Sequence, residues 1–117
     1  MSLTDAVHKA SCDAVVALGD WIAVFTDAAG TTGANEASGG GYARKQATYP
    51  TGSMSGGYWT RTAPGVVLDV AAGTYKEAGN FSASTSGTFR ASAAFTGGDV
   101  EVSGAGATIT VTSTIRA

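Results

Sequence analysis

The sequence is poor in the residues that most often carry chemistry. Its 117 residues include one cysteine, Cys12, and one histidine, His8. A single cysteine excludes an internal disulfide, and a lone histidine without a cysteine pair gives no spacing typical of a transition-metal site. We expect Cys12 to be a small buried apolar residue and His8 to lie at the surface or edge of a helix. The sequence therefore predicts no catalytic residue, no metal ligand and no cofactor.

Charge and long apolar runs are also scarce. Seven Lys and Arg against nine Asp and Glu give a net charge of −2. No basic stripe is available to neutralise phosphates, so nucleic acid is not an expected partner. No apolar run approaches the length of a membrane span, and residues 1–11 lack the charged-then-apolar order of a signal peptide. We expect a protein that is made in a reducing cytoplasm and has no membrane partner.

Bulky side chains are few. Alanine supplies 22 of the apolar residues, whereas Leu, Ile, Val and Phe together number 20 of 117. That fraction would indicate disorder if the net charge were high, but the charge is small and the apolar residues alternate as in strands. We interpret the chain as one domain, with an N-terminal helix in residues 1–19 and a thin-cored β domain in residues 20–117. Packing against copies of itself or another surface would stabilise such a domain.

The N-terminal segment predicts the only helix, over residues 3–18. Ser2 or Thr4 can cap it, and Asp5 and Lys9 are expected to form an ion pair on its solvent side. Apolar residues recur at spacings of three and four and form one narrow stripe: Leu3, Val7, Ala10, Ala14 and Leu18. We expect this stripe to pack closely against a sheet or a neighbouring subunit.

After Asp20 the sequence is typical of β structure. Short segments at about ten-residue spacing are separated by Gly-rich turns, which predicts an antiparallel β-sandwich or barrel-like domain. The expected strands are Trp21–Thr26, Tyr42–Tyr49, Tyr58–Thr62, Val66–Val70, Thr74–Ser82, Thr88–Phe95, Asp99–Val102 and Thr108–Ile115. The first has apolar residues on both faces, which predicts that both are covered. The loop Ala28–Gly41 is long enough to suggest a functional reason.

Four polar residues in and after this loop form the most specific candidate site. The loop is rich in Gly, Thr and Ala and has little apolar mass to hold it still. We expect Asn35 to bond to nearby backbone, and Glu36 to pair with Arg44 beside Tyr42. The predicted role of these residues is to clamp the loop onto the sheet, and a ligand-binding role is the alternative.

Other acidic residues form weaker patterns. Asp99 and Glu101 share one face of a strand, and a solubilising edge explains them better than an acid–base pair. A calcium site built from Asp27, Asn35 and Glu36 is conceivable because the loop supplies oxygen atoms, but the spacing does not match a known calcium loop.

A second candidate site is an interface around Tyr58, Trp59 and Arg61. Adjacent residues on a strand face opposite sides, so either Tyr58 or Trp59 is expected to point outward. Outward aromatic residues are enriched at interfaces and at sugar-stacking sites. Because the core is thin, we favour an interface.

Short motifs surround the long loop: Thr26-Asp27, Gly30, Thr32-Gly33-Ala34-Asn35-Glu36, Gly39-Gly40-Gly41, Tyr42-Ala43-Arg44 and Gln46. Their order resembles small structural proteins of tailed bacteriophages, of the minor tail, tail-fibre-like and capsid accessory kinds. The resemblance covers roughly residues 18–49. It implies a β-rich component of the virion that assembles in several copies, with no catalytic residues to carry over.

Two functions are compatible with this resemblance. The first is a minor capsid or decoration (cement) protein that stabilises the capsid by multi-copy packing on itself, for instance as a homotrimer, and on the major capsid protein. The second is a minor tail or tail-fibre-associated protein that binds tail proteins and contacts the host surface, with Trp59 or Tyr58 against a glycan. A small enzyme is disfavoured because no nucleophile–base set is present.

Overall fold

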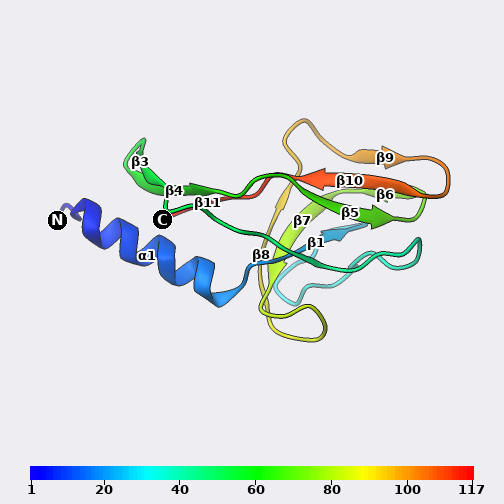
Figure 1. Ribbon diagram of the computed structural model, residues 1–117, viewed down its shortest axis with the longest axis horizontal. Coiled ribbons are helices and arrows are strands. Elements are labelled where there is room, and N and C mark those ends of the chain that lie inside the picture. The colour runs from blue at the N-terminus through cyan, green and yellow to red at the C-terminus, as the bar shows by residue number, and fades with distance from the viewer.

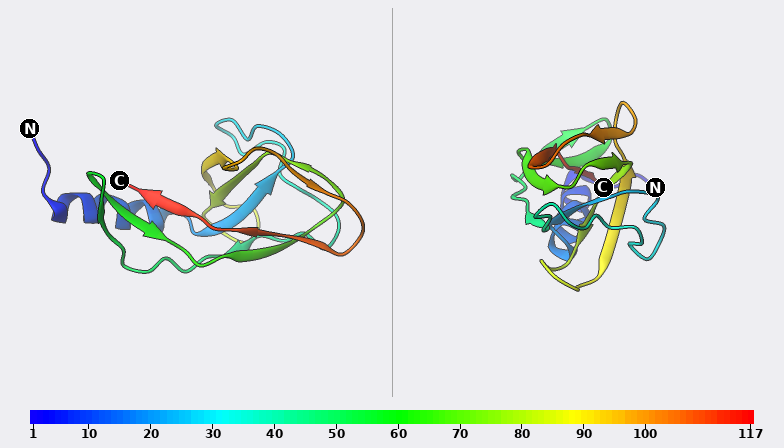
Figure 2. Two further views of the ribbon diagram at one scale, coloured as in Figure 1. Left: turned by 90° about the horizontal axis from the view of Figure 1, so that it is seen from above. Right: turned by 90° about the vertical axis from the view of Figure 1, so that its right-hand side faces the viewer.

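One helix and eleven short strands make up the computed structural model, which describes residues 1–117 (Figure 1). One helix and three strands form an extension at one end: α1 (Asp5–Leu18), β3 (Ser53–Ser55), β4 (Tyr58–Thr62) and β11 (Thr114–Arg116). The remaining strands form a wider β region (Figures 1 and 2). The molecule is elongated, with dimensions of 50 × 28 × 23 Å. The prediction of a mainly β fold with one N-terminal helix is confirmed, and none of the sheets closes into a barrel.

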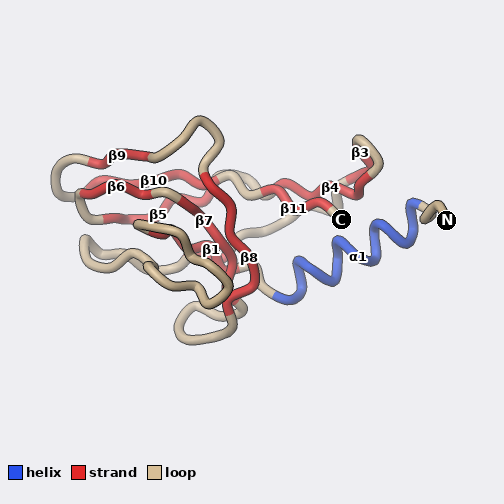
Figure 3. Tube along the Cα trace, turned by 180° about the vertical axis from the view of Figure 1, so that it is seen from behind, coloured by secondary structure: helices blue, strands red, loops and turns tan.

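All strand pairs are antiparallel, and they form four sheets. The largest has the order β2 (Lys45–Gln46), β1 (Trp21–Phe25), β7 (Glu77–Phe81), β8 (Phe89–Ala94). Two further pairs are β10 (Ala107–Val111) with β5 (Val66–Val70), and β6 (Gly73–Tyr75) with β9 (Val100–Val102). The extension contains the sheet β11 (Thr114–Arg116), β4 (Tyr58–Thr62), β3 (Ser53–Ser55). Figure 3 shows that this sheet runs beside α1 and away from the β region.

The main core lies between the largest sheet and the β5–β10 pair. It takes buried side chains from β1, β5 and β10: Ile22, Val24, Leu68, Val70, Ile109 and Val111. A second cluster on the other face of β1 contains Phe25 and Phe81. Both faces of β1 are therefore covered, as predicted. Only 18 of the 117 residues are buried, so the core is thin, and its two layers are consistent with a sandwich-like arrangement.

Several predicted strands are shorter than expected, because the chain changes partners within them. The segment Thr74–Ser82 divides into β6 and β7 at Lys76, whose amide donates to Phe25 O (2.8 Å). The segment Thr108–Ile115 divides into β10 and β11, which pair with β5 and β4 respectively. Of the predicted strand Tyr42–Tyr49, only the two residues of β2 are paired with β1.

One strand was not predicted. The expected strands leave out Thr51–Gly57, but Ser53–Ser55 in this segment forms β3 and pairs with β4. The turn between them contains Gly56 and Gly57, both with positive φ, so the chain reverses tightly enough for a hairpin.

The helix α1 spans Asp5–Leu18, and the side chain of Thr4 caps it by accepting from the amide of Val7. The predicted packing of the apolar stripe against a sheet is wrong, because Leu3, Val7 and Leu18 are 49%, 44% and 50% exposed. The predicted alternative, packing against a neighbouring subunit, stays a prediction. The opposite face, with the fully buried Cys12, packs against the extension sheet. This single helix lacks the length and apolar character that crossing a bilayer requires.

Two features fix the rotation of α1. Residues 19 and 20 alone link it to β1, and Asp13 forms an ion pair with Arg61 of β4 (3.0 Å). The predicted pair of Asp5 with Lys9 is also wrong, because Lys9 Nζ donates to Asp13 Oδ2 instead (2.7 Å). Asp13 is held in place by Arg61 and is therefore the better partner for Lys9.

Candidate functional site: a clamp on the long loop

The loop after β1 folds back along that strand. The amide of Thr26 donates to Asn35 O (3.0 Å), and the amide of Ala37 donates to Val24 O (3.0 Å). Asn35 adopts a positive φ of 65°, a conformation that asparagine tolerates, and its Nδ2 donates to Ala28 O (2.9 Å). The predicted bond from Asn35 to nearby backbone is present. The return path places Glu36 at the edge of β1.

Glu36, Tyr42 and Arg44 then meet in one network, which together with Asn35 we call the loop clamp. Arg44 Nε donates to Glu36 Oε2 and Arg44 Nη2 to Glu36 Oε1, both at 2.8 Å. The Tyr42 hydroxyl also donates to Glu36 Oε2 (2.7 Å). This bidentate geometry is the strong form of an arginine–carboxylate pair. The pairing predicted from the sequence is therefore present in the structure.

Arg44 also ties the loop to the turn between β7 and β8. Its Nη1 donates to Ala83 O (3.1 Å) and Ser86 O (2.6 Å). The guanidinium carbon lies 3.4 Å from the centroid of the Phe81 ring, and only 10% of the Arg44 side chain is exposed. One side chain thus joins three segments of the chain.

The charge states of the clamp are set by its own members. Burial raises the pKa of Glu36, but hydrogen bonds from Arg44 and Tyr42 and the positive charge of Arg44 outweigh burial and lower this pKa overall. Burial, followed by the bond to the Glu36 carboxylate, raises the pKa of Tyr42. The hydrogen bond to Glu36 raises the pKa of Arg44. At neutral pH the clamp therefore holds a charged pair and a neutral phenol, a stable arrangement rather than one poised for proton transfer.

Three of the side-chain oxygen atoms considered for a calcium site accept hydrogen bonds within the chain. Both Glu36 oxygens accept from Arg44, and Asp27 Oδ1 accepts from the amide of Ala28 (2.8 Å). No three His, Cys, Asp or Glu side chains are grouped to hold a metal ion. Asp99 and Glu101 are both exposed, near and within β9. The carboxylates of Asp27 and Glu36 therefore help to fix the shape of the long loop.

Cys12 and His8 help to place α1 on the extension sheet. Cys12 Sγ lies 3.5 Å from Ile115 O, and burial raises the pKa of this thiol, which disfavours the reactive thiolate. His8 Nδ1 lies 3.2 Å from Ala117 O, and its ring contacts Tyr58 edge-on.

The predicted interface residues Tyr58, Trp59 and Arg61 all lie on β4, but only Tyr58 is exposed, at 49%. Trp59 Nε1 donates to Thr51 O (2.8 Å), and Lys9 lies over its ring. One of the two aromatic residues is thus outward, as expected.

Arg61 instead forms a second internal clamp, which sequence reasoning missed. Its side chain is 16% exposed and donates to Tyr49 O (2.6 Å), Pro50 O (2.8 Å) and Asp13 Oδ1 (3.0 Å). Asp13 and Arg61 are 48 positions apart, so no local pattern could have indicated their contact.

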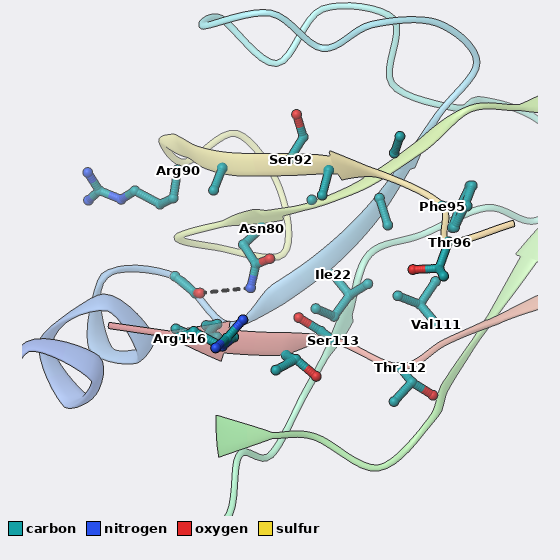
Figure 4. Close-up of a pocket in the computed structure, with 18 of the residues that line it drawn as sticks. Ile22, Asn80, Arg90, Ser92, Phe95, Thr96, Val111, Thr112, Ser113 and Arg116 are labelled. Atoms are coloured by element: carbon teal, nitrogen blue, oxygen red, sulfur yellow. Dashed lines mark hydrogen bonds between the residues drawn. The ribbon is translucent and has the colours of Figure 1, made fainter. Parts of the chain in front are cut away.

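A cavity of about 550 Å³ lies apart from both clamps, between β8 and residues 110–116 (Figure 4). Ile22 and Val111 lie on one side of it, and Asn80 and Ser92 on the other (Figure 4). Asn80 Nδ2 donates to Gly19 O (3.1 Å), and Ser92 Oγ donates to Glu77 (2.9 Å). These polar side chains hold the fold together, and the cavity contains no residue that the sequence singled out as a site.

The clamped loop makes a close backbone contact at Gly40, which gives a first prediction. Gly40 has φ 65°, and a Cβ there would overlap the backbone of Val70 and Ala71. Gly30 in the same loop has φ 62° with no atom near its Cβ direction. We expect Gly40→Ala to lower the free energy of unfolding by about 3 kcal/mol and Gly30→Ala by about 1 kcal/mol, since both add backbone strain but only one adds a clash. Urea denaturation measures both, and equal losses would contradict the packing of the loop on Val70–Ala71.

Comparison of the chain with known protein families, with curated proteins and with solved structures finds no match.

Proposed function

We propose that this chain is a non-catalytic structural component of a tailed-phage virion, acting as a minor capsid or decoration (cement) protein that stabilises the capsid in many copies. One observation carries the proposal. The motif residues that resemble phage structural proteins, Asn35, Glu36, Tyr42 and Arg44, bond to one another or to backbone. The motif residues therefore fix the conformation of the loop, as expected of a structural protein.

The construction of the molecule supports the same function. The thin core is supplemented by two clamps at the partly buried residues Arg44 and Arg61, which hold an elongated shape without much apolar mass. A cement protein contributes buried area at each contact, at roughly 25 cal/mol per Å² of apolar surface, and the gain is multiplied over many copies. Its partners would be copies of itself and the major capsid protein.

A second candidate function rests on Tyr58. Its ring is half exposed on the extension, and the Arg116 guanidinium carbon lies 4.8 Å from the ring centroid. An exposed aromatic ring beside a donor-rich side chain suits stacking on a glycan. This contact favours a minor tail or tail-fibre-associated protein that touches the host surface.

Immunogold electron microscopy of purified virions separates these functions. With antibody against this chain, we expect gold over the head, and none on virions from which the gene has been deleted. Gold confined to the tail end would overturn the capsid assignment in favour of the second candidate. Virions without gold, in a preparation where the antibody detects the purified chain, would overturn the virion role itself.

A further inference from the structure

The cavity shown in Figure 4 borders strand edges that have no neighbour. The strand β10 pairs only with β5, and β11 pairs only with β4. All residues from 110 to 116 line the cavity, whereas no residue of β4 or β5 does, so the cavity lies along the free edge of β10 and β11. Such an edge presents unpaired backbone N–H and C=O groups, which can pair with an added strand. Each wall, residues 90–96 and 110–116, is about 20 Å long at about 3.3 Å per residue.

Small side chains form the wall of the cavity that faces this edge. Ala78 is directly opposite Ala93, and Asn80 is directly opposite Ala91, in the pair β7–β8. These four side chains therefore share one face of the sheet, and all of them line the cavity. Ala91 and Ala93 are exposed, so no strand of the facing layer covers them. The cavity of about 550 Å³ leaves room above the alanines for the bulkier side chains of an added strand.

Two arginines without a carboxylate partner stand at one end of the cavity. Arg44 and Arg61 are held in ion pairs within the chain. Arg90 and Arg116 form no ion pair, and both line the cavity. Figure 4 shows them at the same end, the one nearer α1. No Asp or Glu lines the cavity, so an occupant that carries a carboxylate at this end would meet only positive charge.

The chain also carries an extended segment that packs on nothing. Residues 1–4, which we call the arm, precede α1 and belong to no strand or helix. Met1 is fully exposed and Leu3 is 49% exposed, and side chains two positions apart point the same way in a strand. The arm leads into Asp5, which forms no ion pair. The N-terminus lies at the tip of the extension, so the arm projects away from its own chain (Figures 1 and 2).

We propose that the cavity takes the arm of a second copy of this chain as an added strand. The arm pairs with the free edge of β10 and β11, and Leu3 and Met1 pack on the alanines of β7 and β8. Methionine suits this place because its flexible side chain fills irregular gaps. Asp5 then lies at the end of the cavity where Arg90 and Arg116 stand. The inference rests on the proposed function, in which copies pack on one another, and deepens it by naming the contact.

The positions of the arm and the cavity allow two copies to exchange arms. The arm precedes the first turn of α1, and Val15 in the last turn of α1 lines the cavity. If the α1 helices of two copies run antiparallel, the start of each helix lies near the end of the other, and each arm reaches the cavity of its partner. Both copies then use the same two surfaces, so the assembly closes as a two-fold dimer.

Exchanging charges between two variants tests this inference in sedimentation equilibrium. The apparent mass of the wild type should rise above the 11.6 kDa of the monomer as concentration increases. Asp5→Arg by itself, and Arg90→Glu combined with Arg116→Glu, should each weaken the association constant by roughly tenfold or more, since like charges then meet in the contact. An equimolar mixture of the two variants should associate as the wild type does, because each arm then meets a cavity of opposite charge.

Recovery in the mixture separates charge pairing from damage to the fold, because one misfolded variant would not restore another. Leu3→Ser should also weaken association, since the arm loses its apolar anchor. Val67→Ser is the matched control, because Val67 is 52% exposed on β5 and does not line the cavity, and it should behave as the wild type. A wild type that stays monomeric throughout, or a mixture that associates no better than its separate components, would overturn the proposal.

Cysteine cross-linking gives an independent measurement if a charge variant does not fold. Chains with Leu3→Cys, mixed with chains carrying Ala93→Cys, should form a disulfide-linked heterodimer under mild oxidation, whereas Leu3→Cys with Val67→Cys should not. The native Cys12 is fully buried and leaves the introduced thiols as the accessible ones. Equal cross-linking to both positions would contradict the exchange. These experiments use the chain alone, so the exchange can fail while gold labelling still places the protein in the virion, and the reverse can also happen.

Discussion

Replacing Arg44 with methionine is expected to lower the free energy of unfolding by about 3 kcal/mol, because the Arg44–Glu36 pair is partly buried and each hydrogen bond lost to a charged group contributes about 1.5–3 kcal/mol. The substitution removes both bonds to Glu36 and the bonds to Ala83 and Ser86. It also leaves the Glu36 carboxylate, which is 23% exposed, without its counter-ion. Methionine preserves much of the apolar contact with Phe81, so the loss of unfolding free energy measures the contribution of the polar bonds of the clamp. Urea denaturation of the purified variant measures it.

Two further variants make this measurement specific. Arg90→Met is the matched control, because Arg90 is exposed and its side chain makes one bond, to Leu18 O (2.9 Å), and we expect a loss of under about 1 kcal/mol. Glu36→Gln in the Arg44→Met background should cost little more than Arg44→Met alone, since the stranded charge is then removed. If Arg44→Met and Arg90→Met were equally stable, the clamp would not hold the loop.

The clamp also makes stability depend on pH in a defined direction. The pKa of Glu36 is lower in the folded protein than in the unfolded chain. The pair therefore contributes fully above the unfolded pKa of about 4.3, and its contribution is lost as pH falls through the lowered folded pKa. The difference in stability between wild type and Arg44→Met should accordingly shrink on acidification below about pH 4. A difference that stayed constant would show that the pair is not the source of the loss.

The parts of the structure that were predictable are those set by local sequence. The clamp could be predicted because Glu36 and Arg44 are only 8 positions apart, and because a loop of small residues needs polar bonds to be ordered. The strand β1 and its burial could be predicted because both of its faces carry apolar residues, and each apolar face must be covered. The strands Tyr58–Thr62 and Val66–Val70 match their predicted limits because Gly and Pro residues border them.

The parts that were not predictable depend on contacts between distant segments. The apolar stripe of α1 was expected to pack against a sheet or a neighbouring subunit, and it does not face the sheet. The helix is oriented by its short link to β1 and by the distant pair Asp13–Arg61. Two predicted strands are each split in two, at Lys76 and between β10 and β11, where the chain moves from one sheet to another. The alternation of side chains along the sequence does not change at these points. Sequence periodicity gives the face of an element, but which neighbour covers that face is a property of the whole fold.

The aromatic cluster beneath the loop gives the other large expected effect. Phe25 is fully buried and contacts the rings of Phe81 and Phe89, with centroids at 6.1 and 5.8 Å. Arg44 stacks on Phe81 from the loop side, so the cluster and the clamp are in direct contact. We expect Phe25→Ala to lower the free energy of unfolding by about 4 kcal/mol, because truncation leaves a cavity that the surrounding strands cannot fill.

Because the total stability of such a domain is about 5–15 kcal/mol, that loss would leave Phe25→Ala close to unfolding. Phe95→Ala is the control and should cost about 1–2 kcal/mol, because Phe95 is only partly buried and its truncation opens a smaller cavity. Thermal unfolding followed by circular dichroism compares the two. Because Phe81 contacts both Phe25 and Arg44, the losses from Phe25→Ala and Arg44→Met should not add in the double variant. Equal losses at Phe25 and Phe95 would contradict the larger cavity expected at Phe25. Strict additivity of Phe25→Ala and Arg44→Met would mean that the loop and the cluster are stabilised independently, and the shape of the loop would then have to be explained by its polar bonds alone.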